Sequence, residues 1–156
     1  MNDLKRLIQE DIPLITVGFA DKTEPRVIEK GIQSGLDVAE LRVDLYSSFD
    51  QEYVLREIRK FKKIPTVATI RIKEEGGTWS KSEKERLSLF KAIINEVSSV
   101  DIELHSESIL PEVIKVAHAA DKLVFISYHN FELTPGLDEL NKIAQKRSVC
   151  DIKFCV

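Results

Sequence analysis

The sequence predicts an α/β fold in which parallel strands and helices alternate and close as a (β/α)8 barrel. Two patterns carry this prediction. Short apolar runs rich in Val and Ile alternate strictly with stretches of helical periodicity along the chain. In addition, most of these runs place their ionisable side chains on one face only, near the C-terminal end of the run. The length of 156 residues is enough for one domain with a core and too short for two comfortable ones.

The alternation predicts a strand at each apolar run and a helix between consecutive runs. The predicted strands are residues 14–19, 38–43, 66–70, 100–104, 123–128 and 152–156. The predicted helices are residues 25–33, 51–61, 83–97, 110–119 and 137–146.

Local start and stop signals support these helices. Asp50 precedes the second helix as an N-cap, and Ser82 with Glu85 forms a capping box before the third. Thr134, followed by proline, is expected to cap the fifth helix. Gly35 suits the C-terminal end of the first helix.

Two architectures are compatible with parallel strands joined by helices. Size favours an open doubly wound sheet, because a complete barrel needs about 250 residues. The side-chain period of a strand favours the barrel. An open sheet would bury its charged face under a second helix layer, whereas a barrel brings that face to its axis. The residues on this face are Glu40 and Arg42, Thr69 and Arg71, Asp101 and Glu103, Ser127 and His129, and Asp151 and Lys153.

The composition excludes several classes of protein. A net charge of −3 without a Lys/Arg stripe argues against nucleic-acid binding. No apolar run approaches the ~20 residues of a membrane span, and the N-terminal residues lack the apolar core of a signal peptide. Cys150 and Cys155 share one predicted strand at odd spacing, so they point to opposite faces and cannot bridge each other. We expect reduced cysteines in a cytoplasmic protein.

Most ionisable candidates have a structural interpretation beside the functional one. Glu40 and Arg42 could form an ion pair along their strand. Asp101 could be a strand-end carboxylate or half of a metal pair, but no His or Cys nearby completes a ligand set. His105 and His118 are interpreted as surface or helix-end residues.

Three residues have a sharper functional interpretation. Lys153 is an edge lysine or, at a barrel axis, a desolvated amine that is neutral enough to attack a ketone. His129 lies where the fifth strand ends. The loop that contains Gly76 and Gly77 is either a flexible connection or a device that places Glu75 beside the site.

Five segments together resemble a known family. In order, "AELRVDLY", "ATIRIKEEGG", "VDIELHS", "SYHNFELTP" and "CDIKFCV" resemble the motifs of type I 3-dehydroquinate dehydratases, from Leu14 to the C-terminus. The resemblance implies a (β/α)8 barrel lyase of the shikimate pathway. Such an enzyme dehydrates 3-dehydroquinate to 3-dehydroshikimate without a metal or an organic cofactor, and it is usually a homodimer.

The resemblance also assigns roles to residues of this chain. Lys153 would form a Schiff base with the ketone of the substrate, His129 would act as general base and acid, and Glu75 would orient His129. Glu40, Arg42 and Arg71 would bind substrate hydroxyls, Asp101 would support the polar groups near the lysine, and Phe131 would wall the pocket.

The chain departs from the family after its sixth strand, because members continue for two more strand–helix units. Residues 1–156 are therefore expected to be a single catalytic barrel domain that lacks those units. Three alternatives remain: a Schiff-base aldolase-type barrel, a non-catalytic barrel fragment that oligomerises, and a flavodoxin-like binding module with an open sheet.

Overall fold

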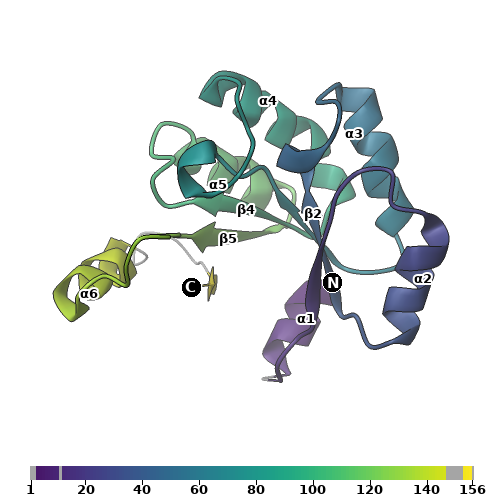
Figure 1. The fold of residues 1–156 in the computed structure, drawn as a ribbon, viewed down its shortest axis with the longest axis horizontal. Helices are drawn as coiled ribbons and strands as arrows, with labels where there is room; N and C mark the ends of the chain where they lie inside the picture. Colours follow the sequence, from purple (N-terminus) through teal and green to yellow (C-terminus); the bar gives the residue numbers. More distant parts are fainter. Residues whose placement is uncertain (1–2, 11, 147–152, 156) are drawn as a thin grey trace.

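The computed structural model describes residues 3–10, 12–146 and 153–155 (Figure 1). Its centre is a six-stranded parallel sheet whose strands follow one another in chain order. The strands are β1 (Thr16–Phe19), β2 (Val38–Arg42), β3 (Thr66–Thr69), β4 (Ser99–Glu103), β5 (Leu123–Ser127) and β6 (Lys153–Cys155).

This strand order decides between the two architectures. A doubly wound sheet reverses its order at a switch point, as a flavodoxin-like module would. Here every strand pairs in parallel with the one before it in the chain, which is the arrangement of a (β/α)8 barrel. The barrel prediction is confirmed, with six of the eight strands present in the described part of the chain.

The predicted helices occur at the expected positions, and one more precedes them. Figure 1 shows α2 to α5 along one side of the sheet and α1 on the other. The helices are α1 (Asp3–Gln9), α2 (Pro25–Gln33), α3 (Gln51–Ile58), α4 (Glu83–Ile93), α5 (Leu110–Ala119) and α6 (Leu137–Lys146). Short 3-10 turns extend α3 and α4 to Phe61 and Glu96.

Most of the expected caps are present. The Asp50 side chain accepts a hydrogen bond from the Tyr53 amide, and Ser82 and Glu85 form the reciprocal capping box. Gly35 ends α2 with a positive φ of 96°. The expected cap at Thr134 is wrong, because α6 begins three residues later and its first turn closes on the Gly136 carbonyl.

The apolar face of the sheet and the helices that cover it form the core. Ala39, Leu41, Val100 and Ile102 are completely buried there, as their alternation predicts. The opposite face carries the ionisable residues and meets α1, whose Leu4 is also buried. Helix α1 is not among the helices that the sequence pattern predicts.

Two expectations reach outside the described part of the chain. Cys150 and Asp151 lie outside the described residues, so the predicted orientation of the cysteines stays a prediction. Within the described residues, no helix has the length and apolar character needed to cross a membrane.

Candidate active site

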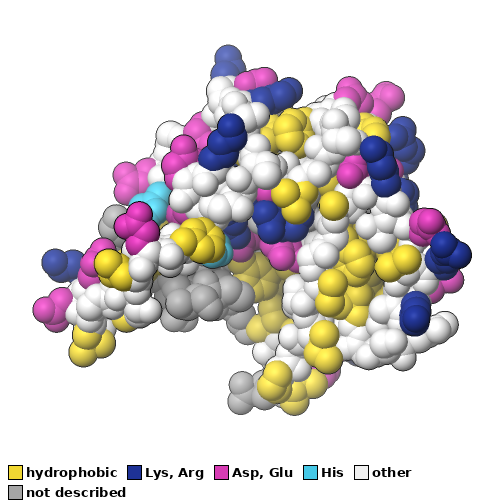
Figure 2. All heavy atoms as spheres, in the orientation of Figure 1, with side chains coloured by type: hydrophobic (Ala, Val, Ile, Leu, Met, Phe, Trp, Pro, Cys, Tyr) yellow, Lys and Arg dark blue, Asp and Glu magenta, His cyan; other side chains and the backbone are white. Residues whose placement is uncertain are grey.

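A cavity of about 460 Å³ lies between the inner face of the sheet and α1. Figure 2 shows acidic and basic side chains gathered beside a hollow with apolar walls on this face of the molecule. Leu4 and Ile8 of α1 and Val38 and Val67 of the sheet are among its apolar residues. Its polar lining is formed by Glu40, Arg71, Asp101, Ser127 and His129, from four consecutive strands or the residues just after them.

Arg71 organises one wall of the cavity. It is 6% exposed, and its Nη2 lies 2.7 Å from Asp101 Oδ1. Its Nη1 donates to Ser127 Oγ at 2.5 Å, and the Ser127 hydroxyl in turn donates to Asp101 Oδ1 at 2.8 Å. These contacts tie the C-terminal ends of β3, β4 and β5 together.

Asp101 and Glu103 lie two residues apart on β4, yet their titration is shifted in opposite directions. Burial raises the pKa of Asp101 to about 6, although Arg71 and Ser127 oppose that shift. Burial also acts to raise the pKa of Glu103, but Arg86 and the hydrogen bonds at its carboxylate outweigh it, so this pKa is lowered. Arg71 therefore pairs with one carboxyl group that accepts a proton readily and one that does not.

Arg86 is not recognisable as a site residue from the sequence, where it lies within a well-capped helix. It is completely buried, and its Nη1 donates to Glu103 Oε2 at 2.8 Å and to the Ile70 carbonyl at 3.0 Å. Its Nη2 pairs with Glu83 at 3.0 Å and donates to Ser106. Arg86 thus fixes the carboxylate of Glu103 from the helix side of the sheet.

Glu40 and Arg42 share the inner face but do not pair with each other as the structural interpretation suggested. Both lie over Gly18 of β1, where an added Cβ would come within 3.7 Å of either side chain. Glu40 accepts a hydrogen bond from Thr69 Oγ1 at 2.8 Å. Arg42 makes a bidentate pair with buried Asp44, at 3.0 and 2.9 Å, and hydrogen bonding to Asp44 raises the pKa of Arg42.

Glu75 reaches the site from the loop after β3. Its side chain is 4% exposed. Its Oε2 accepts two hydrogen bonds from His129, one from the backbone amide and one from the ring Nδ1, both at 2.9 Å. Backbone hydrogen bonds fold the loop tightly, from the amides of Glu75 and Gly77 to the Ile72 carbonyl. A Cβ at Gly77 would lie 2.0 Å from the Arg71 carbonyl oxygen, so only glycine fits there.

Phe131 lies on the outer side of His129. Its ring stacks on the imidazole with a centroid distance of 6.2 Å and an interplanar angle of 11°. The residue is 74% exposed and is not among the residues that line the cavity. Phe131 therefore covers the imidazole and the neighbouring Gly76, and it does not wall the cavity in this structure.

The position of Lys153 is known from its backbone alone. It lies in β6 in register with Phe125 of β5, a residue that lines the cavity. Its side chain lies outside the described part of the structure. Among the described residues, no group of three or more His, Cys, Asp or Glu side chains is arranged to hold a metal ion.

The structure thus brings together, from separate strands, Glu40, Arg71, Asp101 and His129, with Glu75 behind the histidine. Arg42 stands beside them, held by Asp44. No sequence signal identifies Asp44 or Arg86, because each is recognisable only from the partner that it meets in the fold. The interpretation of His105 as a surface residue is incomplete, because its Nδ1 lies 3.0 Å from Glu75 Oε1.

Comparison with known proteins points to one family. A sequence profile described as type I 3-dehydroquinase matches residues 14–155. The 3-dehydroquinate dehydratase of Methanococcus maripaludis strain C7 is 42% identical over 113 residues, which cover 70% of this chain and 50% of that protein.

Solved structures agree with this result. The crystal structure of 3-dehydroquinate dehydratase from Aquifex aeolicus VF5 superposes with a TM-score of 0.77 at 33% identity, over 86% of this chain and 61% of that one. The type I enzyme from Clostridium difficile, solved with covalently modified comenic acid, gives a TM-score of 0.73 at 26% identity, over 86% and 60%. The chain spans about half the length of the curated relatives it matches.

Proposed function

Because the chain belongs to the type I 3-dehydroquinase family, we propose that it acts as a lyase that dehydrates 3-dehydroquinate to 3-dehydroshikimate. The observation that carries the proposal is the buried Glu75 paired with His129 at the edge of a cavity whose wall is built from Arg71 and Asp101. In (β/α)8 barrels, active sites lie at the C-terminal ends of the strands, where these residues lie.

In this proposal Lys153 is the nucleophile. Its neutral amine attacks the ketone carbon of the substrate. The former carbonyl oxygen takes one proton from the amine and one from the solvent and leaves as water, which gives a protonated Schiff base. The positive nitrogen then withdraws electrons from the adjacent carbon and acidifies the hydrogen there. The register of Lys153 beside Phe125 supports this role, as does the covalently modified ligand in the Clostridium difficile relative.

His129 moves the proton. Donation of its Nδ1–H to Glu75 leaves the lone pair of Nε2 available as a base. It removes the acidified hydrogen, and the electron pair of the C–H bond moves towards the nitrogen to give an enamine. The enamine expels the hydroxyl group from the next carbon, which takes the proton from His129 and departs as water. Hydrolysis of the remaining imine releases the product and regenerates Lys153.

The other polar residues bind the substrate. We assign Glu40 and Arg42 to the substrate hydroxyls, with Asp44 fixing the guanidinium of Arg42. The guanidinium of Arg71 is already engaged by Asp101 and Ser127, so its part in binding is to present a rigid wall. Phe131 would reach the substrate only if the loop after β5 moved towards the cavity. No metal ion or organic cofactor has a role in this scheme.

The experiment that tests the mechanism is trapping of the Schiff base. The chain is incubated with 3-dehydroquinate and sodium borohydride, and its intact mass and peptide map are measured. We expect one adduct, on the peptide that contains Lys153. Lys153→Met should abolish it, whereas Lys115→Met on the exposed surface of α5 should leave it unchanged.

A second protein makes the outcome decisive. It joins residues 1–156 to the remaining C-terminal part of the Methanococcus maripaludis relative, since this chain matches only half of that protein. An adduct in the extended protein alone would mean that the additional strands are needed for activity. No adduct in either protein would refute the dehydratase proposal.

The proposal includes three further features. Residues 1–156 would form one catalytic domain with six of the strand–helix units of the barrel, and the protein would be a homodimer in the cytoplasm. This chain matches only 50% to 61% of the length of its relatives, which supports a domain with fewer strand–helix units than theirs. Analytical ultracentrifugation tests the second, because a monomer at micromolar concentration would contradict it. Cell fractionation tests the location.

A further inference from the structure

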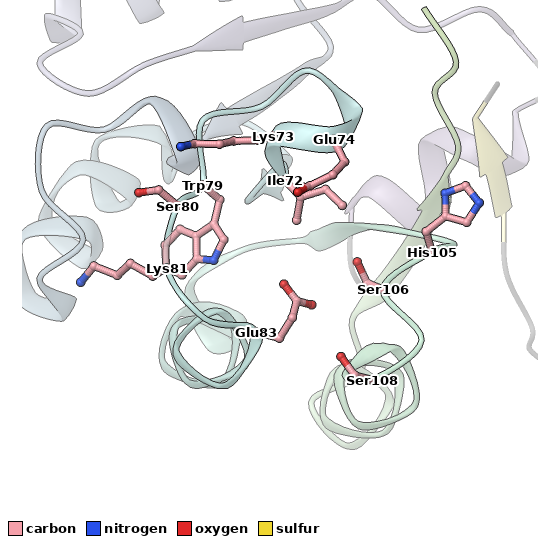
Figure 3. Close-up of a pocket in the computed structure, with 10 residues that line it drawn as sticks. All are labelled: Ile72, Lys73, Glu74, Trp79, Ser80, Lys81, Glu83, His105, Ser106 and Ser108. Atoms are coloured by element: carbon pink, nitrogen blue, oxygen red, sulfur yellow. The ribbon is translucent and has the colours of Figure 1, made fainter.

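His105 occupies an unexpected position directly after β4. Its Nδ1 lies 3.0 Å from Glu75 Oε1, and its ring meets Tyr128 edge-on at 5.2 Å. The side chain is 55% exposed, and it borders a second cavity of about 410 Å³, outside the barrel axis, that Trp79 and Ser106 also line. Figure 3 shows His105 at one side of this cavity, separate from the loop of residues 72–81 on the other.

The carboxylate of Glu75 is therefore shared by two histidines. Oε2 faces His129 and Oε1 faces His105, each at hydrogen-bond distance. The ion partners of Glu75 within the described part of the chain are these two imidazoles. Because Glu75 is 4% exposed, water does little to screen its charge from either ring.

We propose that His105 is a positioning residue that controls the protonation of His129 through Glu75. When His105 is neutral, the negative charge of Glu75 favours a proton on His129. When His105 carries a proton, its positive charge offsets that of Glu75, and His129 releases its proton more readily. The coupling is reciprocal, so the two imidazoles titrate as a pair rather than independently.

Other charged groups face each of the two histidines. The second cavity, beside His105, presents two lysines and two glutamates, so neither sign of charge dominates; they are Lys73, Glu74, Lys81 and Glu83. The Tyr128 ring contacts His105 from the end of β5. On the other side of Glu75, the charged residues that share the axial cavity with His129 are Glu40, Arg71 and Asp101.

The relation to catalysis rests on the proposed function, but the coupling can be measured without any turnover. The sequence contains three histidines, so their ring signals can be resolved and assigned by NMR. His118 is exposed on α5 and serves as an internal reference. We follow the three rings from pH 5 to pH 9 in the unaltered chain and in two variants.

The variants separate the charge of His105 from its hydrogen bond. His105→Asn places an amide donor near the position of Nδ1 but cannot take up a proton. His105→Phe keeps a ring and removes both properties. In the unaltered chain we expect a titration curve for His129 that is broader than a one-proton curve.

Both variants should narrow the titration curve of His129, and the width that remains is assigned to Asp101, whose pKa is raised to about 6 in the same cavity. In both variants the midpoint should also move upwards, because neither replacement can place a positive charge beside Glu75. His105→Asn should keep the ring signals of His129 closer to those of the unaltered chain. A purely structural role for His105 would leave the width of the curve unchanged.

The inference is overturned if His129 titrates as a single group in the unaltered chain, or if its curve is as broad in both variants as in the unaltered chain. These results are independent of the trapping experiment. A coupled pair in a protein that forms no borohydride adduct would uphold this inference and refute the proposed function. An adduct without coupling would do the reverse.

Discussion

Replacement of Asp101 by Asn tests the electrostatics of the site most directly, because it removes a buried charge and little else. Asp101 and Glu103 lie on the same face of β4, and both contact Arg71, at 2.7 and 3.2 Å. Burial makes ionisation of Asp101 costly despite that contact, whereas Arg86 at 2.8 Å favours ionisation of Glu103. The two carboxyl groups should therefore respond to pH with opposite signs.

The magnitude follows from the raised pKa. A rise in the pKa of Asp101 from 3.8 to about 6 corresponds to about 3 kcal/mol of preference for the protonated form in the folded protein. Between these pH values the folded state binds more protons than the unfolded state, so the free energy of unfolding falls as pH rises. Asp101→Asn lacks this dependence. Between pH 4 and pH 7, the unaltered chain should lose about 2–3 kcal/mol relative to the variant.

Urea unfolding followed by tryptophan fluorescence measures this difference, since Trp79 is the one tryptophan of the sequence and lies in the core. Glu103→Gln is the matched control. The pKa of Glu103 is lowered in the folded state, so its stabilisation is present above its ordinary value of 4.5 and is lost as pH falls. A flat difference for Asp101→Asn, or the same sign for both variants, would refute the reasoning.

Two further substitutions test the packing behind the site. Gly77→Ala places a Cβ 2.0 Å from the Arg71 carbonyl oxygen and should lower the free energy of unfolding in urea by ~2 kcal/mol or more. Gly136→Ala is the control, because the space around Gly136 is open, and it should lower the free energy of unfolding by less than about 1 kcal/mol. Equal losses in the two variants would contradict the assigned loop geometry. Arg86→Met leaves the carboxylate of Glu103 buried without its closest cation and should cost about 3–5 kcal/mol. Adding Glu103→Gln should recover part of that loss, and strictly additive costs would mean that the two residues are not coupled.

Much of the fold could be predicted from the sequence because its causes are local. Alternation along β2 and β4 separates Leu41 and Ile102 from Glu40 and Asp101, since successive side chains of a strand point to opposite faces. The caps of α3 and α4 follow from residues within four positions of each other. Helix α1 was not predicted because its apolar face is short, and the reason for that face is seen only in the folded chain, where it covers the cavity.

The site divides in the same way. Strand parity alone predicts that Glu40, Arg71, Asp101 and His129 share one face of the sheet. The alternation of side chains along a strand does not show which residues will contact each other. The contacts that build the site join residues that are far apart in the chain. Glu75 and His129 are separated by 54 residues, and Arg71 and Ser127 by 56.

The sequence by itself determined the class of fold, the face on which the charged residues lie, and the family that they resemble. The tertiary structure decided that Arg86 holds Glu103 and that one buried carboxylate serves both His105 and His129. The reason is physical. A strand's period is set by the backbone of each residue, whereas a hydrogen bond between two loops exists only after the strands have aligned and brought those loops together.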